Sequence, residues 1–291
     1  MTTASEPAGV GDAPDLLEVV DDAGLPVAQE PTTREEFAAA VSRTGTAPTV
    51  VATLHLDGPT NTMSHAFKVG ADDNNEYWIK TLEGVEPHHA PSLALEQVIS
   101  RLGVLLGISV VQPYLVRIPV GMKLPTMSNS RDAQPGLAHA ARAYESCVEK
   151  KAPPERRNED DNRRRHVGIF ALLDLARGGD LQYLYDANAY GAIVSHDHGL
   201  YVCQTGTMDV TAMIAAVADA GVSGGDSAGL DVAEINRLAD RLDGLTAAEV
   251  LGIVNLVPPE WPVTDEQLGT LAWFLYTRAK PVAARVRGYL P

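Results

Sequence analysis

Residues 76–107 read EYWIKTLEGVEPHHAPSLALEQVISRLGVLLG, which joins a short β pattern to a long helical pattern across a proline-containing break. In the β pattern, alternation places Trp78, Lys80 and Leu82 on one face of the expected strand. In the helical pattern, apolar residues return every three or four positions, at Leu95, Ile99, Leu102 and Leu106. The stretch therefore predicts a strand followed by one amphipathic helix that packs on its sheet.

The residues on either side extend the β pattern. TVVATLHL at 49–56 and SHAFKV at 64–69 precede it, and the Asp- and Asn-containing segments between these runs favour tight turns. We therefore expect three antiparallel strands. SVVQPYLVRIPV at 109–120 predicts a further strand, whose proline indicates an edge position or a bulge.

The N-terminus is different in character. Residues 1–31 lack periodicity and predict a disordered tail, because they have little apolar surface to bury. Thr33 and Glu36 then stand at the capping-box spacing, which predicts the start of a short helix.

The remaining pattern divides the chain into two lobes. Residues 32–120 predict a β-rich lobe with one main helix, and residues 162–291 predict a mostly helical lobe. Residues 121–161 predict an irregular connection, which includes most of the charged loop 149–165. The expected fold class is α+β, with a cleft between the lobes.

The composition limits the classes of function. With 38 acidic against 23 basic side chains, the formal charge is -15, which argues against bulk binding to nucleic-acid phosphates. The two cysteines, Cys147 and Cys203, are too few for a disulfide framework and fit a reducing compartment. The N-terminus lacks a signal-peptide pattern and no apolar run reaches about 18 residues, so we expect a cytoplasmic protein without a membrane span.

Four charged residues stand at the ends of expected elements, where side chains from different elements can converge. Lys80 is placed to hold phosphate oxygens, although a solvated lysine at a sheet edge fits the same pattern. Glu96 lies at the border of the apolar stripe, from which it could pair with Lys80. Asp180 follows a helix and Asp197 follows a short apolar run, so they could place one acid beside an attacking hydroxyl and another on a metal. For Asp197 alone, an ordinary turn aspartate is the competing interpretation.

The histidines allow another interpretation. His196 and His198 flank Asp197, and His88 and His89 could add further ligands for a metal hydrolase. We keep this as a minor alternative, because His-x-His lacks the helix spacing or cysteine partners of specific zinc motifs.

Several segments together resemble the compact bacterial HipA-like kinase family. The resemblance rests on EYWIK at 76–80, the helix at 93–107, FALLDLARGGD at 170–180 and HDHG at 196–199, in that order. It implies a two-lobed protein-kinase-like fold, with ATP and Mg²⁺ as ligands.

The resemblance also implies roles for individual residues. It makes Lys80 the phosphate-binding lysine, Glu96 its partner, Asp180 the catalytic base and Asp197 the magnesium ligand. The nucleotide loop would be DGPTNTMS, whose backbone amides and hydroxyls would cradle phosphates. The loop residues concerned are Gly58, Thr60, Thr62 and Ser64.

The catalytic segment departs from the family pattern. Leu181 and Gln182 stand where the family has Arg and His, and Tyr185 stands where it has a metal-binding Asn. Asp186 or Asn188 would then have to supply the missing oxygen ligand.

Two hypotheses of function follow from the resemblance and its departures. The first is an ATP- and Mg²⁺-dependent serine/threonine kinase that acts on a protein substrate. The second is a pseudokinase that binds a protein partner, with or without control by nucleotide. The metal hydrolase remains the minor third.

Overall fold

The computed structural model describes residues 30–124, 134–151, 156–179, 181–219 and 221–290. Two predictions concern residues outside these ranges: nearly all of the expected tail at 1–31, and the expected catalytic base Asp180. Within the described ranges, no helix is both long enough and apolar enough to cross a membrane.

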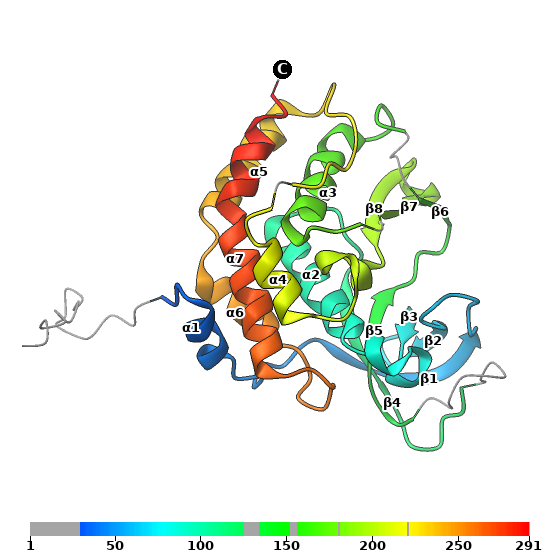
Figure 1. The fold of residues 1–291 in the computed structure, drawn as a ribbon. Coiled ribbons are helices and arrows are strands. Elements are labelled where there is room, and N and C mark those ends of the chain that lie inside the picture. The colour runs from blue at the N-terminus through cyan, green and yellow to red at the C-terminus, as the bar shows by residue number, and fades with distance from the viewer. Residues whose placement is uncertain (1–29, 125–133, 152–155, 180, 220, 291) are drawn as a thin grey trace, which may run out of the picture. The chain divides into compact units, whose positions relative to one another are not determined.

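Five strands form a closed barrel in the order β1-β2-β3-β5-β4 (Figure 1). They are β1 (Thr49–Asp57), β2 (Phe67–Ala71), β3 (Glu76–Lys80), β4 (Pro113–Ile118) and β5 (Gly136–Arg142). Neighbours are antiparallel except β1 and β4, whose parallel pairing closes the barrel. The three expected antiparallel strands are confirmed, whereas the closure was not expected from the sequence.

Two strands lie in the stretch 121–161 that was expected to be irregular. β5 reads GLAHAAR and has no β-branched residue, so its local pattern gives no strand signal. Its place in the barrel decides its structure, because it pairs with β3 on one edge and β4 on the other, and Ala138 and Ala140 are fully buried. The other strand is β6 (Cys147–Lys151). The prediction was wrong for these residues because long-range pairing supplies what the local sequence lacks.

Helices build the C-terminal part around the long helix α7 (Asp265–Arg287), drawn in orange to red in Figure 1. The helices that contact it are α1 (Arg34–Ala40), α3 (Asn162–Ala176), α4 (Val210–Ala216), α5 (Val232–Asp243) and α6 (Ala247–Val254). α1 begins at the predicted capping box of Thr33 and Glu36. It was expected in the β-rich lobe, but it packs on α7, where the rings of Phe37 and Tyr276 lie 5.5 Å apart.

A second, three-stranded sheet lies beside α3, in the antiparallel order β6-β7-β8. It adds β7 (Gln182–Asp186) and β8 (Ala192–His196). The main chain at 109–111 runs along β8, because Val111 N donates to Ser195 O and Ser195 N donates to Ser109 O, both at 3.0 Å. This contact fixes the end of β8 near the start of β4, and hence near the barrel.

α2 (Ser92–Leu106) is the predicted main helix. Its four apolar-stripe residues are buried, and it packs against β4 and β5 and also against α3, α5 and α6. The helix ends at Gly107, whose φ of +72° is the left-handed cap conformation that favours glycine. α2 therefore contacts both the barrel and the helices, and it can present side chains where the two meet.

Two hydrophobic cores match this division. The smaller fills the barrel, with Phe67, Val69, Tyr77 and Ile79 among its residues, and the larger runs through α2 and the C-terminal helices. The chain is thus an α+β protein with a β-rich N-terminal part and a helical C-terminal part, as the sequence predicted.

Candidate functional site

A cavity of about 370 Å³ lies where the barrel, α2 and the three-stranded sheet meet. A second cavity of about 290 Å³ adjoins it, because several residues line both. The shared residues are Thr62, Ser64, Lys80, Glu96, Glu149 and Asp197. Five of these six had been singled out in the sequence, and the structure brings those five together.

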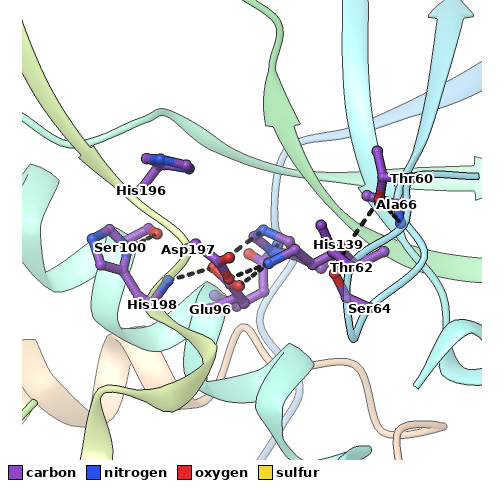
Figure 2. Close-up of polar contacts among 12 residues, drawn as sticks. Thr60, Thr62, Ser64, Ala66, Glu96, Ser100, His139, His196, Asp197 and His198 are labelled. Atoms are coloured by element: carbon purple, nitrogen blue, oxygen red, sulfur yellow. Dashed lines mark hydrogen bonds and ion pairs between the residues drawn. The ribbon is translucent and has the colours of Figure 1, made fainter. Parts of the chain in front are cut away.

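Lys80 lies at the centre of this group. It ends β3, and strand alternation turns it into the same cavity as Trp78, as predicted. Its Nζ donates to Glu96 Oε1 and, at 2.6 Å, to Asp197 Oδ1. Figure 2 labels these two acidic residues, which lie side by side. Burial favours a lower pKa for the Lys80 ammonium, but the charges of Glu96 and Asp197 outweigh it and raise that pKa. Lys80 is therefore a fixed positive charge in the cavity.

Glu96 projects from α2 and is almost fully buried, with 3% of its side chain exposed. Besides the Lys80 ammonium, its carboxylate accepts the backbone N–H of His198 at 3.0 Å on Oε2. Burial raises the pKa of Glu96 to about 7; Lys80 opposes this increase and the nearby Asp197 charge adds to it. Glu96 thus holds both Lys80 and the turn after β8 in place.

Asp197 follows β8 directly and has a backbone φ of 57°, in the left-handed region that favours glycine. The next turn passes close to Glu96, since a Cβ on Gly199 would lie 3.2 Å from Glu96 Oε1. Lys80 holds the pKa of Asp197 well below its usual range, although burial opposes the shift. With 37% of its side chain exposed, Asp197 is the ionised and accessible carboxylate of the pair.

The sequence reasoning missed the hydrogen-bonded groups around these three residues. On one side, Gln97 Nε2 donates to His139 Nδ1 at 2.9 Å, and His139 Nε2 lies 3.8 Å from Glu96 Oε2. The donation leaves the ring proton on Nε2, directed toward the Glu96 carboxylate. Burial and the positive charge of Lys80 hold the pKa of His139 well below its usual range, so the ring is neutral. His139 faces Lys80 from β5, a strand that no local pattern indicated.

On the other side, His198 is enclosed by serines. Ser100 Oγ lies 2.8 Å from its Nδ1 and Ser195 Oγ lies 2.9 Å from its Nε2. Burial lowers the pKa of His198 to about 3. Both ring nitrogens are engaged within the fold, so His198 is not available as the metal ligand that the hydrolase interpretation required.

The predicted nucleotide loop connects β1 to β2 beside the cavity. Its hydroxyl residues Thr60, Thr62 and Ser64 line the cavity, and Thr60 Oγ1 lies 2.8 Å from Thr62 Oγ1 (Figure 2). Thr60 N donates to Ala66 O at 2.9 Å, which closes the base of the loop. Gly58 does not line the cavity; its φ is +98° and a Cβ there would lie 2.7 Å from Ala66 O. Glycine at position 58 thus allows the loop to turn. It shapes the loop and does not itself face the cavity.

The predicted metal ligands Asp186 and Asn188 are not near Asp197. In the antiparallel register of β7 and β8, Asp186 lies opposite Ala192, at the end of β8 remote from Asp197. Asp186 instead accepts the backbone N–H of Asn188 at 2.9 Å. The prediction that either residue joins Asp197 on a metal was wrong, because the direction of β7 carries both away from it.

β7 also determines where Tyr185 lies, the residue at the position where the resemblance would have a metal-binding Asn. Tyr185 points into the core and is 1% exposed, whereas Gln182 and Leu184 line the cavities. Gln182 lies opposite His196, next to Asp197.

Glu149 of β6 faces the same space opposite Leu184, although the sequence had indicated a solvated loop there. Within the described ranges, no group of three or more His, Cys, Asp or Glu side chains is arranged to hold a metal ion.

Comparison with known proteins gives little further information. No family model matches the chain, and neither does any curated protein. Two crystal structures of the Golgi casein kinase, one with Mn/ADP bound, align with TM-scores of 0.37 and 0.38 at 10% and 9% identity. These alignments cover 89% of this chain and 76% and 77% of those chains. A similarity at this level assigns neither fold nor function, so both rest on the contacts of the chain itself.

Proposed function

We propose that the chain binds ATP with Mg²⁺ in the cavity between the barrel and the three-stranded sheet, and that it is a serine/threonine kinase-like protein of the HipA-like class. The observation that carries the proposal is the convergence of Lys80, Glu96 and Asp197 with the hydroxyl loop on one cavity. A buried lysine held by a helix glutamate beside an accessible aspartate is the arrangement that kinases use to hold nucleotide phosphates and metal.

The cavity combines two kinds of chemistry. Ala66, Val111, Ala141 and Leu184 give it apolar walls from both the barrel and the sheet, which suit a planar base. Thr62, Ser64 and Lys80 line the same cavity, and they would hold phosphate oxygens by hydrogen bonds and charge. The lining residues therefore suit a nucleoside triphosphate.

For the metal, Asp197 would be the main ligand, because it is ionised and exposed to the cavity. Bound there, Mg²⁺ would neutralise charge on the phosphates. Glu149 and Gln182 face the same space and offer the oxygen donors that a hard cation prefers. Phosphoryl transfer would further require Asp180 to orient a substrate hydroxyl.

The pseudokinase is the second candidate, and a specific observation favours it. Tyr185, at the position of the family's metal-binding Asn, is committed to the core, so β7 cannot bring that position to the cavity. The residues proposed to bind nucleotide thus match a kinase better than the residues proposed for phosphoryl transfer do. A nucleotide-dependent interaction with a protein partner would need only the nucleotide-binding residues.

A matched pair of variants tests the proposed site. Asp197→Asn should abolish the Mg²⁺-dependent rise in melting temperature with ATP, whereas Asp186→Asn on the same sheet should leave it intact. At about 100-fold excess over Kd, ligand binding adds about 2.7 kcal/mol to the free energy of unfolding, so the effect is large enough to measure. If the two variants respond alike, Asp197 is not the metal ligand.

Cys147 provides a second readout, because it is exposed and lines the cavity. ATP with Mg²⁺ should slow its alkylation, followed by mass spectrometry, while the rate at Cys203 stays constant. Transfer of labelled phosphate to the protein or a substrate, lost in Asp180→Ala, would then favour the kinase. Protection of Cys147 without any transfer would favour the pseudokinase.

A further inference from the structure

The Lys80 ammonium donates to two carboxyl groups from different elements at once. Glu96 comes from α2 and Asp197 from the segment after β8, and each places an oxygen within hydrogen-bond distance of Nζ. His198 adds a backbone N–H, which donates to Glu96 Oε2. One ammonium is thus shared between two carboxyl groups.

This geometry is also one that a divalent cation would accept. Two carboxylate oxygens converge on a single point, and Asp197 opens onto the cavity from that point. A metal ion that binds Asp197 must therefore either displace the ammonium or approach it closely. At a few ångströms, repulsion between a monovalent and a divalent cation is several kcal/mol even at an effective dielectric constant of about 20.

Displacement of the ammonium also has a cost. Lys80 has 17% of its side chain exposed, so without Asp197 its ammonium would keep only the Glu96 carboxyl group as a partner. A buried charge with incomplete pairing is strongly destabilising. Free nucleotide without metal meets the opposite problem, because its phosphates approach Asp197 while that carboxylate keeps its charge.

We propose that Lys80 is an internal competitor for the metal, which makes the cavity select the metal–nucleotide complex over free metal or free nucleotide. The inference rests on the proposed function, and it adds how the proposed site selects which ligands bind in the cavity. When both ligands arrive together, Lys80 transfers its hydrogen bond from Asp197 to a phosphate oxygen, and Asp197 becomes free for the metal. Each charged group exchanges one partner for another, so binding of metal and nucleotide is positively coupled.

Mn²⁺ is the probe, because the electron paramagnetic resonance signal of free Mn²⁺ reports its binding directly. Mn²⁺ is titrated into the wild type and Lys80→Met, each with and without a non-hydrolysable ATP analogue. Lys80→Arg keeps a cation at the site. Lys280→Met, on an exposed position of α7, makes the same change in net charge away from the cavity.

Lys80→Met should bind Mn²⁺ alone at least about tenfold more tightly than the wild type, since the competing charge is gone. Lys80→Arg and Lys280→Met should resemble the wild type in that measurement. The nucleotide analogue should tighten Mn²⁺ binding at least about tenfold in the wild type and less than about threefold in Lys80→Met.

A folded Lys80→Met that binds Mn²⁺ no better than the wild type would overturn the inference, whether or not nucleotide binds. If circular dichroism shows that Lys80→Met does not fold, the double variant Lys80→Met/Glu96→Gln replaces it, with the same expected gain. That variant leaves no unpaired carboxylate at position 96. A gain in Mn²⁺ affinity together with no nucleotide binding by the wild type would support the competition and refute the proposed function.

Discussion

Three buried histidines should make the folded chain sensitive to mild acid. His139, His166 and His198 are each 2% exposed or less, and burial lowers the pKa of His166 to about 4 and that of His198 to about 3. The unfolded chain takes up a proton on each ring near its ordinary pKa of about 6.5, while the folded chain does not. The free energy of unfolding is therefore fully retained above that pH and falls as the pH decreases below it.

The magnitude follows from these pKa values. Between about pH 7 and about pH 5, His166 and His198 each remove about 2 kcal/mol from the free energy of unfolding, and His139, whose pKa is also lowered, acts in the same direction. Glu96 acts in the opposite direction, because its raised pKa lets the folded chain bind a proton in this interval, which returns about 2 kcal/mol. Asp197 does not enter the balance, since its folded pKa lies below this range. His166 and His198 together outweigh the glutamate, so the expected net loss is at least about 2 kcal/mol.

His198→Gln isolates one of these contributions. Glutamine can still bond with the two serines but does not titrate, so the variant should lose about 2 kcal/mol less than the wild type between the two pH values. Urea unfolding followed by circular dichroism measures the loss within each protein, so any constant cost of the substitution cancels. His88→Gln, at an exposed position, is the control and should behave as the wild type. Equal losses in the wild type and His198→Gln would refute a neutral His198.

Two further predictions concern the fold and the loop. Asp174→Ala should lower the free energy of unfolding by about 3–5 kcal/mol, because it leaves the buried Arg278 without its carboxylate partner. Asp243→Ala, which breaks a surface ion pair, should cost less than about 1 kcal/mol, and urea unfolding compares the two. Gly84→Ala should weaken ATP binding severalfold in a calorimetric titration and also lower the melting temperature, since the added Cβ would lie 2.7 Å from the backbone oxygen of Ser64 and displace the loop. An unchanged affinity would show that the loop position does not matter.

The parts of the site that could be predicted belong to elements with strong local patterns. Period-2 alternation oriented Lys80, and the apolar stripe of α2 placed Glu96 at its border. The turn after the apolar run of β8 located Asp197. In each case a local rule indicated where the residue lies on its element. These three positions were enough to expect that the side chains share one cleft.

The rest depends on pairings between distant segments. His139 lies opposite Lys80 only because β5 joins the barrel, and the sequence of β5 contains no strand signal. Asp186 was expected to replace the ligand missing at Tyr185, but the register of β7 against β8 separates it from Asp197 by the length of a strand. Spacing along the chain therefore located the elements, whereas the sheet register determined which of their residues meet.

The three charged residues do not support a ligand equally. Lys80 and Glu96 are buried and matched, so removing either one would leave an unpaired charge in the interior, and folding alone is enough to account for the pair. Asp197 is different, because it is partly exposed and has a left-handed backbone that costs a non-glycine residue of order 1–3 kcal/mol. Glycine would adopt that backbone without strain, so the turn itself does not require a carboxylate at this position. The hydroxyl loop likewise lines the cavity with groups that the core does not need. The case for a nucleotide and metal site thus rests more on Asp197 and the loop than on the buried pair beside them.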